Sequence, residues 1–224
     1  MTPPNASDSP RVWSWEDYFI PGTNVLRNKF TTPTQPFGEA NPVRLRQLEE
    51  IASNVRMQEL KSVPILGAFD YVHMKAIHRY IFQDVYDWAG EERTAPTTFM
   101  TKNGYPYYPA GPALKADANK LYRALADDNY LRELEFVPFV ERLAEYWGEL
   151  NVIHSFREGN TRTQFVFFSQ LAEFAGYRLA AEVFNADPLL RQDFNKARFQ
   201  GQATASNAAL AVVLSRIIIP ASQH

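Results

Sequence analysis

Residues 136–176 read FVPFVERLAEYWGELNVIHSFREGNTRTQFVFFSQLAEFAG. After Pro138, which suits a first helical turn, apolar residues recur at helical spacing as far as Ile153. A second apolar pattern starts at Thr163 and stops at Gly176, a residue typical of the position just past a helix end. The stretch therefore predicts two buried helices joined by the polar loop HSFREGNTR.

The helical period recurs on both sides of this stretch. It predicts further helices over residues 45–55, 68–87, 114–125, 185–199 and 206–219. In the second of these, we expect His78 to pack inside the protein and His73 to face its surface. Residues 1–12 are expected to form a disordered tail, residues 13–200 one domain with an N-terminal extension, and residues 201–224 a C-terminal helix packed on that domain.

Residues 93–108, RTAPTTFMTKNGYPYY, lack the helical period. They contain an Asn103-Gly104 pair, and because both residues tolerate a positive φ angle we predict a β-hairpin. A lone hairpin is only marginally stable, so it must pack on the body of the protein or pair with another strand. The predicted fold class is all-α with one hairpin, and an exposed hairpin edge is suited to capturing a peptide by strand pairing.

The 224 residues include 46% hydrophobic and 21% charged residues, the balance of a soluble globular protein. A formal charge of -2 gives no basic surface for a nucleic-acid backbone, so no nucleic-acid partner is expected. The lack of a long apolar run, and of a signal peptide in residues 1–10, predicts a cytoplasmic protein without a membrane partner. There are no cysteines, which excludes disulfides, thiolate metal sites and a cysteine nucleophile.

The predicted loop carries the side chains with chemistry. Gly159-Asn160-Thr161-Arg162 precedes a helix, where backbone N–H groups and the positive end of the helix dipole bind phosphate. His154 is suited to taking a proton from a hydroxyl, Glu158 is a hard oxygen ligand for magnesium, and Arg162 offers a planar fork to phosphate. The competing interpretation is ordinary helix capping, with Glu158 only complementing the dipole.

Residues 154–162 resemble the signature of the Fic family, His-any-Phe-any-Asp/Glu-Gly-Asn-Gly-Arg, which after two further residues has a second Arg. Six of the eight fixed positions match. Residues 77–91 (IHRYIFQDVYDWAGE) resemble the family's helix leading to its flap, and residues 21–29 (PGTNVLRNK) resemble the start of bacterial Fic toxins. The resemblance extends from about Tyr18 to Gly176 and implies a Fic-fold helical bundle with a hairpin flap over the active-site loop.

The resemblance implies a protein adenylyltransferase, of the kind found in bacterial toxins, that transfers AMP from ATP to a Ser, Thr or Tyr hydroxyl of a target protein. His154 would be the general base and Glu158 would coordinate Mg2+. Gly159, Asn160, Thr161 and Arg162 would hold the phosphates, and Phe156 would anchor the loop. The flap that docks the target would contain Thr97, Thr98, Phe99, Met100, Thr101 and Lys102.

Two positions depart from the family pattern. Thr161 replaces the second Gly, which leaves its N–H in place but adds a side chain near the phosphates. Phe165 occupies the place of the second Arg, which in the family holds the γ-phosphate and pairs with an inhibitory Glu. The family's inhibitory pattern, Ser/Thr-any-any-any-Glu-Gly/Asn, is absent from the sequence. The protein is therefore restrained by a separate partner, such as an antitoxin, through other contacts, or it is not restrained in the way usual for the family.

Two other functions stay open at this point. One is a nucleotide-binding or protein-interaction module without turnover. The other is an enzyme of the same fold with a different phosphate-transfer chemistry or another nucleotide. A silent module would need no base, so the presence of both His154 and Glu158 favours an enzyme.

Overall fold

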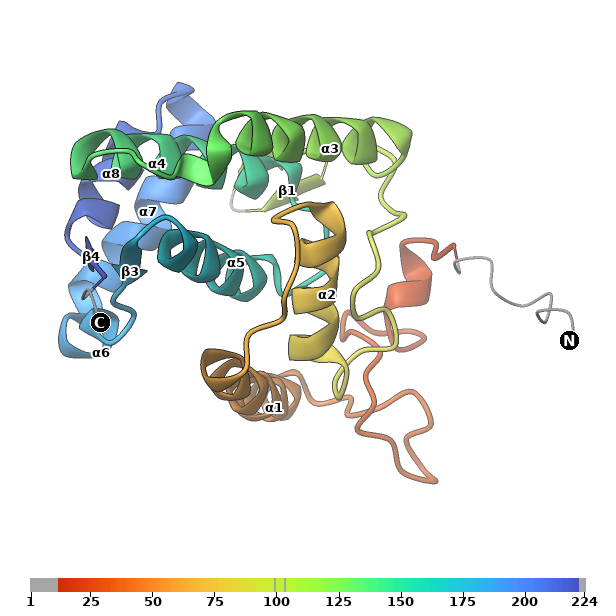
Figure 1. The fold of residues 1–224 in the computed structure, drawn as a ribbon. Coiled ribbons are helices and arrows are strands. Elements are labelled where there is room, and N and C mark those ends of the chain that lie inside the picture. Colours follow the sequence, from red (N-terminus) through yellow and green to blue (C-terminus); the bar gives the residue numbers. More distant parts are fainter. Residues whose placement is uncertain (1–11, 99, 103, 222–224) are drawn as a thin grey trace, which may run out of the picture.

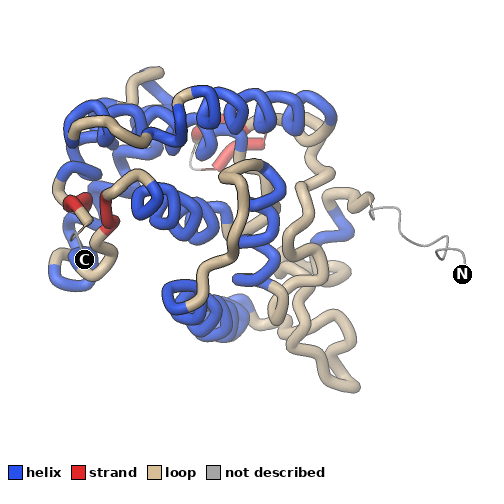
Figure 2. Tube along the Cα trace, viewed as in Figure 1, coloured by secondary structure: helices blue, strands red, loops and turns tan. Residues whose placement is uncertain are grey.

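The computed structural model describes residues 12–98, 100–102 and 104–221. Short 3-10 turns occupy Glu16–Tyr18 and Asn129–Leu131, and none of the helices in this described part is both long and apolar enough to cross a membrane. Helices dominate the tube in Figure 2. They are α1 (Pro42–Ser62), α2 (Tyr71–Phe82), α3 (Pro112–Asp127), α4 (Phe136–Ile153), α5 (Asn160–Phe174), α6 (Val183–Ala186), α7 (Pro188–Thr204) and α8 (Ala208–Ser215).

Helices α4 and α5 form the centre of the core, which confirms the two buried helices predicted from the sequence. α5 contacts α2 and α4, and in Figure 1 it lies between α7 on one side and α2 on the other. Trp147 of α4 stacks on Phe168 of α5 with 4.6 Å between ring centroids, and both side chains are fully buried. Leu143 and Leu171 are also fully buried, so aromatic and aliphatic area removed from water holds the pair together.

Three of the six long helices in the described residues, α1, α2 and α7, begin at a side-chain cap. α1 follows Asn41, α2 follows Asp70 and α7 follows Asp187. In each case the side-chain oxygen accepts a hydrogen bond from a backbone N–H two or three residues further on. No side chain in the described part of the chain caps α3, α4 or α5, and α5 begins after Gly159.

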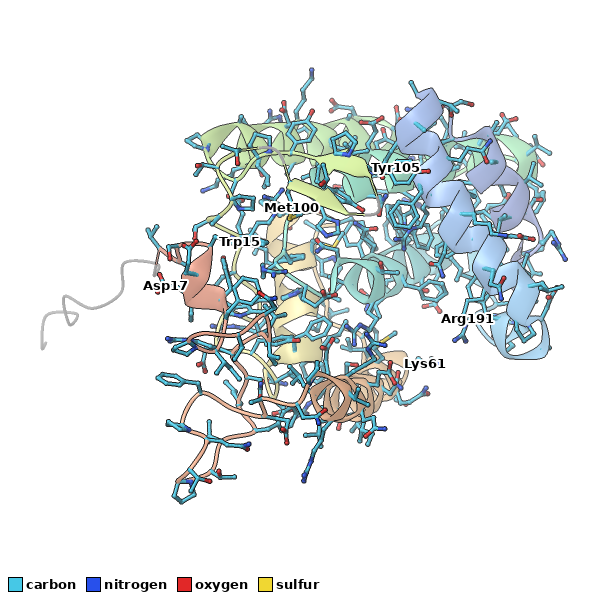
Figure 3. The ribbon with its side chains drawn as sticks, turned by 180° about the vertical axis from the view of Figure 1, so that it is seen from behind. Trp15, Asp17, Lys61, Met100, Tyr105 and Arg191 are labelled. Atoms are coloured by element: carbon cyan, nitrogen blue, oxygen red, sulfur yellow. The ribbon has the colours of Figure 1, made fainter. Side chains whose placement is uncertain are left out.

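The predicted hairpin is present. Strand β1 (Met100–Lys102) pairs antiparallel with β2 (Tyr105–Tyr107), with Met100 opposite Tyr107. Phe99 and Asn103, which the sequence assigned to the flap and its turn, lie outside the described residues. β2 packs on α4 and α7, where the Tyr105 ring stacks on Phe199 at 5.1 Å (Figure 3). The body of the protein thus supports a hairpin that would be unstable alone.

The C-terminal part contains a second small sheet that the sequence analysis did not predict. Strand β3 (Tyr177–Leu179) pairs antiparallel with β4 (Ile218–Pro220). The helix expected over residues 206–219 therefore ends at Ser215, because the β-branched run Ile217–Ile219 favours a strand and a short apolar run has no diagnostic period. The expected boundary after residue 200 falls inside α7.

The expectation that His73 faces the surface is wrong. Its side chain is 3% exposed, and its Nε2 donates to the carbonyl oxygen of Ile65 at 2.9 Å. The loop before α2 folds back over the ring, and a Cβ at Gly67 would lie 2.3 Å from the imidazole. Helical periodicity does not reveal such a loop, because it describes one helix face and not the segment that covers it.

Candidate active site

The loop between α4 and α5 is folded by the side chain of Asn160. Its Oδ1 accepts the Phe156 N–H at 2.9 Å, and its Nδ2 donates to the Phe156 carbonyl at 2.7 Å. Both side chains are buried. The sequence analysis expected Asn160 to hold phosphate, whereas the structure uses its amide to close the loop that carries the other candidate residues.

His78 of α2 fastens the same loop to the segment before the hairpin. Its Nε2 donates to the Glu158 carbonyl at 3.0 Å, and its Nδ1 accepts the Gly90 N–H at 2.8 Å. The ring stacks on Phe156 with 3.9 Å between centroids. Complete burial, with a smaller effect of the Arg162 charge, lowers the pKa of His78 to about 3. His78 is therefore a neutral packing histidine, as predicted.

Arg93, which the sequence analysis missed, holds His154 from the backbone side. Its Nε donates to the His154 carbonyl at 2.7 Å, and its Nη2 donates to the carbonyls of Tyr108 and Ile153. Its own N–H donates to the Ser155 carbonyl at 2.9 Å. A single arginine beside Thr and Pro has no distinctive spacing, so no sequence signal marked it.

His154 caps the C-terminus of α4 in the left-handed conformation, at φ 50° and ψ 59°. This conformation is uncommon for a residue other than glycine and persists only where the surroundings impose it. The imidazole is 8% exposed and lies against the Tyr107 ring of β2, with 4.1 Å between centroids. The hairpin therefore covers the candidate base, and this contact links the flap to the loop.

The N-terminus of α5 is an anion site by geometry. Gly159 precedes it at φ 80°, and its N–H donates to Oε1 of Glu158 at 3.0 Å. Because the first N–H groups of a helix lack intrahelical acceptors and no side chain caps this end, those of residues 160–162 remain available. The positive end of the helix dipole adds to their attraction for an anion.

Glu158 and Arg162 line a cleft of about 480 Å³ between the loop, α1 and residues 24–26. Arg162 pairs with Glu49 of α1 and donates to the Ser53 hydroxyl at 2.9 Å. The other carboxylate oxygen of Glu49 accepts the Tyr86 hydroxyl at 2.6 Å. The cleft thus gathers Glu158 and Arg162, while His154 lies outside its lining, under the hairpin.

The two departures from the family pattern have different surroundings. Thr161 is half-buried in the first turn of α5. Phe165, one turn further, packs against Trp147, Phe184 and Phe194 with centroids 5.8, 6.0 and 6.3 Å away. The α5 surface at position 165 is therefore an apolar contact with α6 and α7.

A methyl group at Gly159 has no room. The added Cβ would lie 2.2 Å from the buried Phe82 ring, and the residue would still need φ 80°. We expect Gly159→Ala to lower the free energy of unfolding by about 2–5 kcal/mol, measured by urea denaturation. Gly176→Ala is the matched control, since Gly176 has φ 90° but no atom within 4 Å, and it should lose only about 1–2 kcal/mol. Equal losses would contradict the proposed contact.

The buried neutral His78 predicts a pH dependence of stability. Its pKa is about 3 in the folded protein against 6.5 for the ordinary group, so between these values only the unfolded chain binds the proton. Its contribution is complete above the higher value and falls as the pH is lowered. His78→Gln keeps one donor and one acceptor without titrating. The free energy of unfolding of this variant should therefore fall less steeply as the pH is lowered, by up to about 1.4 kcal/mol per pH unit. If the free energy of unfolding, measured by urea denaturation, had the same pH dependence in both proteins, this prediction would be contradicted.

Comparison with known proteins places this site in a family. A sequence profile described as Fic/DOC family matches residues 68–172. The chain is 36% identical over 160 residues to "Probable protein adenylyltransferase y4lH" of Sinorhizobium fredii, covering 71% of this chain and 76% of that protein. It is 29% identical over 208 residues to "Probable protein adenylyltransferase Fic" of Escherichia coli, covering 93% and 94% respectively.

A solved structure shares the fold. The N-terminal Fic domain of a VirB-translocated Bep effector from Bartonella quintana, crystallised with ADP, superposes with a TM-score of 0.81 at 24% identity. The similarity covers 92% of this chain and 96% of that domain. The y4lH relative and the sequence profile show that the chain belongs to the Fic/DOC family.

Proposed function

We propose that this protein is a protein adenylyltransferase, which transfers AMP from ATP to a Ser, Thr or Tyr hydroxyl of a target protein. The observation that carries the proposal is one loop that presents His154 and Glu158 beside the uncapped N-terminus of α5. The names of the relatives from Sinorhizobium fredii and Escherichia coli support the same activity.

In the proposed reaction the target hydroxyl oxygen attacks the α-phosphorus of ATP. The new bond joins that oxygen to AMP, the bond from the α-phosphorus to the bridging oxygen breaks, and pyrophosphate leaves. His154 takes the hydroxyl proton as general base. Arg93 and the left-handed backbone fix where its ring lies, so little reorganisation is needed when the substrate arrives.

Glu158 suits a magnesium ion that arrives with the nucleotide. Mg2+ is commonly held by one or two carboxylates together with phosphate oxygens and water, and Glu158 supplies one carboxylate at the rim of the cleft. The described residues contain no group of three or more His, Cys, Asp or Glu side chains that could hold a metal by themselves. When bound, the ion would neutralise phosphate charge.

We assign the phosphates to the first turn of α5. The N–H groups of Asn160, Thr161 and Arg162 point along the helix axis to its N-terminal end, and the Thr161 side chain does not remove its N–H. Arg162 contributes positive charge from the side of the cleft. Since its guanidinium is paired with Glu49 here, direct contact with phosphate requires exchange of that partner.

We assign target docking to the hairpin. In the described part of the chain β1 pairs only with β2, so its outer edge can receive an extended target segment. Thr97, Thr98 and Thr101 are exposed and Met100 is half-buried. Phe99 and the side chain of Lys102 lie outside what the structure describes and are included by sequence alone.

The activity is tested with ATP labelled at the α- or the γ-phosphate, magnesium, and bacterial and eukaryotic lysates as sources of target. Label from α-ATP should appear on a discrete protein and fall by about 10²- to 10⁴-fold with His154→Asn. Asn tolerates the left-handed backbone, so the variant removes the base while the loop keeps its shape, which thermal unfolding checks.

The remaining outcomes separate the other functions. Label only from γ-ATP would mean protein phosphorylation. No label from either position, repeated with GTP, CTP and UTP, would indicate a module without turnover.

A further inference from the structure

Arg198 of α7 is a buried cation without a charged partner. Its side chain is 4% exposed, and its Nε and Nη1 have no hydrogen-bond partner. Among the ion pairs of the described residues none includes Arg198. Its guanidinium lies 5.4 Å from the Phe194 ring centroid, and the neighbouring titratable group is the Tyr107 phenol.

Burial of this kind is costly. A buried charge that lacks both hydrogen bonds and a counter-ion destabilises the folded state, and here burial lowers the pKa of Arg198 to about 10. Arg93 is equally buried but donates to three backbone carbonyls. Arg198 thus has the chemistry of a cation that is completed by an anionic ligand.

The position of Arg198 identifies the ligand group. Strand β2 lies between α7 and the candidate base, because its Tyr107 ring contacts His154 at 4.1 Å and its Tyr105 ring stacks on Phe199, the residue after Arg198. In the proposed reaction the α-phosphorus must lie near His154. A cation on α7, the helix that packs on this strand, is therefore suited to the phosphates beyond the α position.

We propose that Arg198 binds the outer phosphates of the nucleoside triphosphate from α7. The inference rests on the proposed function for the identity of the nucleotide. Arg198 is buried and its helix packs on β2, so binding requires these elements to separate where Tyr105 meets Phe199. A planar guanidinium with two unused N–H directions gives phosphate a bidentate contact.

The test compares Arg198→Met with Arg191→Met by isothermal titration calorimetry of ATP, ADP, AMP and inorganic tripolyphosphate. Methionine keeps an unbranched side chain of similar length without charge, and a buried charge replaced in this way leaves the fold intact or more stable. Arg191 carries the same charge on the exposed side of α7 (Figure 3). Thermal unfolding without ligand checks both variants.

We expect Arg198→Met to raise the Kd of ATP and tripolyphosphate by about 10- to 100-fold, leaving AMP within about twofold. Arg191→Met should leave the Kd of all four ligands unchanged. An unchanged Kd for ATP in Arg198→Met would overturn the inference even if AMP transfer is established. Loss of tripolyphosphate binding would support it even if no AMP transfer is found, in which case only the proposed function fails. A wild-type protein that binds neither ATP nor tripolyphosphate would overturn both.

Discussion

The loop that carries the candidate chemistry depends on one side chain, that of Asn160. By bonding both the N–H and the carbonyl of Phe156, it closes a compact turn in a loop that would otherwise contain unpaired buried polar groups. The turn lies between two residues in the left-handed conformation, His154 and Gly159, and presents the Glu158 carbonyl to His78. The candidate base, the Glu158 carboxylate and the N-terminus of α5 are thus placed together by a hydrogen-bond pair that need not touch a substrate.

The arginines around the loop differ in the partners that compensate their charge. Arg93 is satisfied by backbone carbonyls, and Arg157 lies 4.3 Å from the centroid of the Trp15 ring. Arg162 has Glu49, Ser53 and the Phe82 ring. Each of these cations has a carbonyl, carboxylate or aromatic partner in the folded chain that offsets part of its desolvation. Arg198 also lies against an aromatic ring, that of Phe194, but it is more deeply buried than Arg157, and its Nε and Nη1 have no hydrogen-bond partner among the described residues.

Much of the fold could be predicted from the sequence, because the apolar patterns of α4 and α5 are long and are interrupted by a distinctive polar loop. The hairpin followed from Asn103-Gly104 and from the absence of helical period around it. The second sheet could not be predicted, since Ile217–Ile219 is too short for its period to separate helix from strand. His73 was misplaced because the residues that cover it come from a neighbouring loop.

The residues of the candidate site also fall into two groups, those that local sequence predicts and those that depend on tertiary contacts. Local sequence gave His154, Glu158 and the α5 N-terminus, which are neighbours in the chain. It did not give Arg93, Tyr107 or Glu49, whose relation to the loop exists only through tertiary contacts. Nor could it show that the Asn160 amide is consumed by Phe156, because a phosphate ligand and a loop-closing residue have the same sequence signal.

Phe165 and Arg198 are best understood as one arrangement. An aromatic side chain at position 165 offers an apolar surface to α6 and α7, and Phe184 and Phe194 pack on it. The next turn of α7 carries Arg198, whose guanidinium lies 5.4 Å from the Phe194 ring centroid. An arginine at position 165 would put a charge into that aromatic cluster and would oppose the docking of α7. Where the family signature has an arginine on α5, this chain therefore has an apolar contact with α7, the helix that carries Arg198.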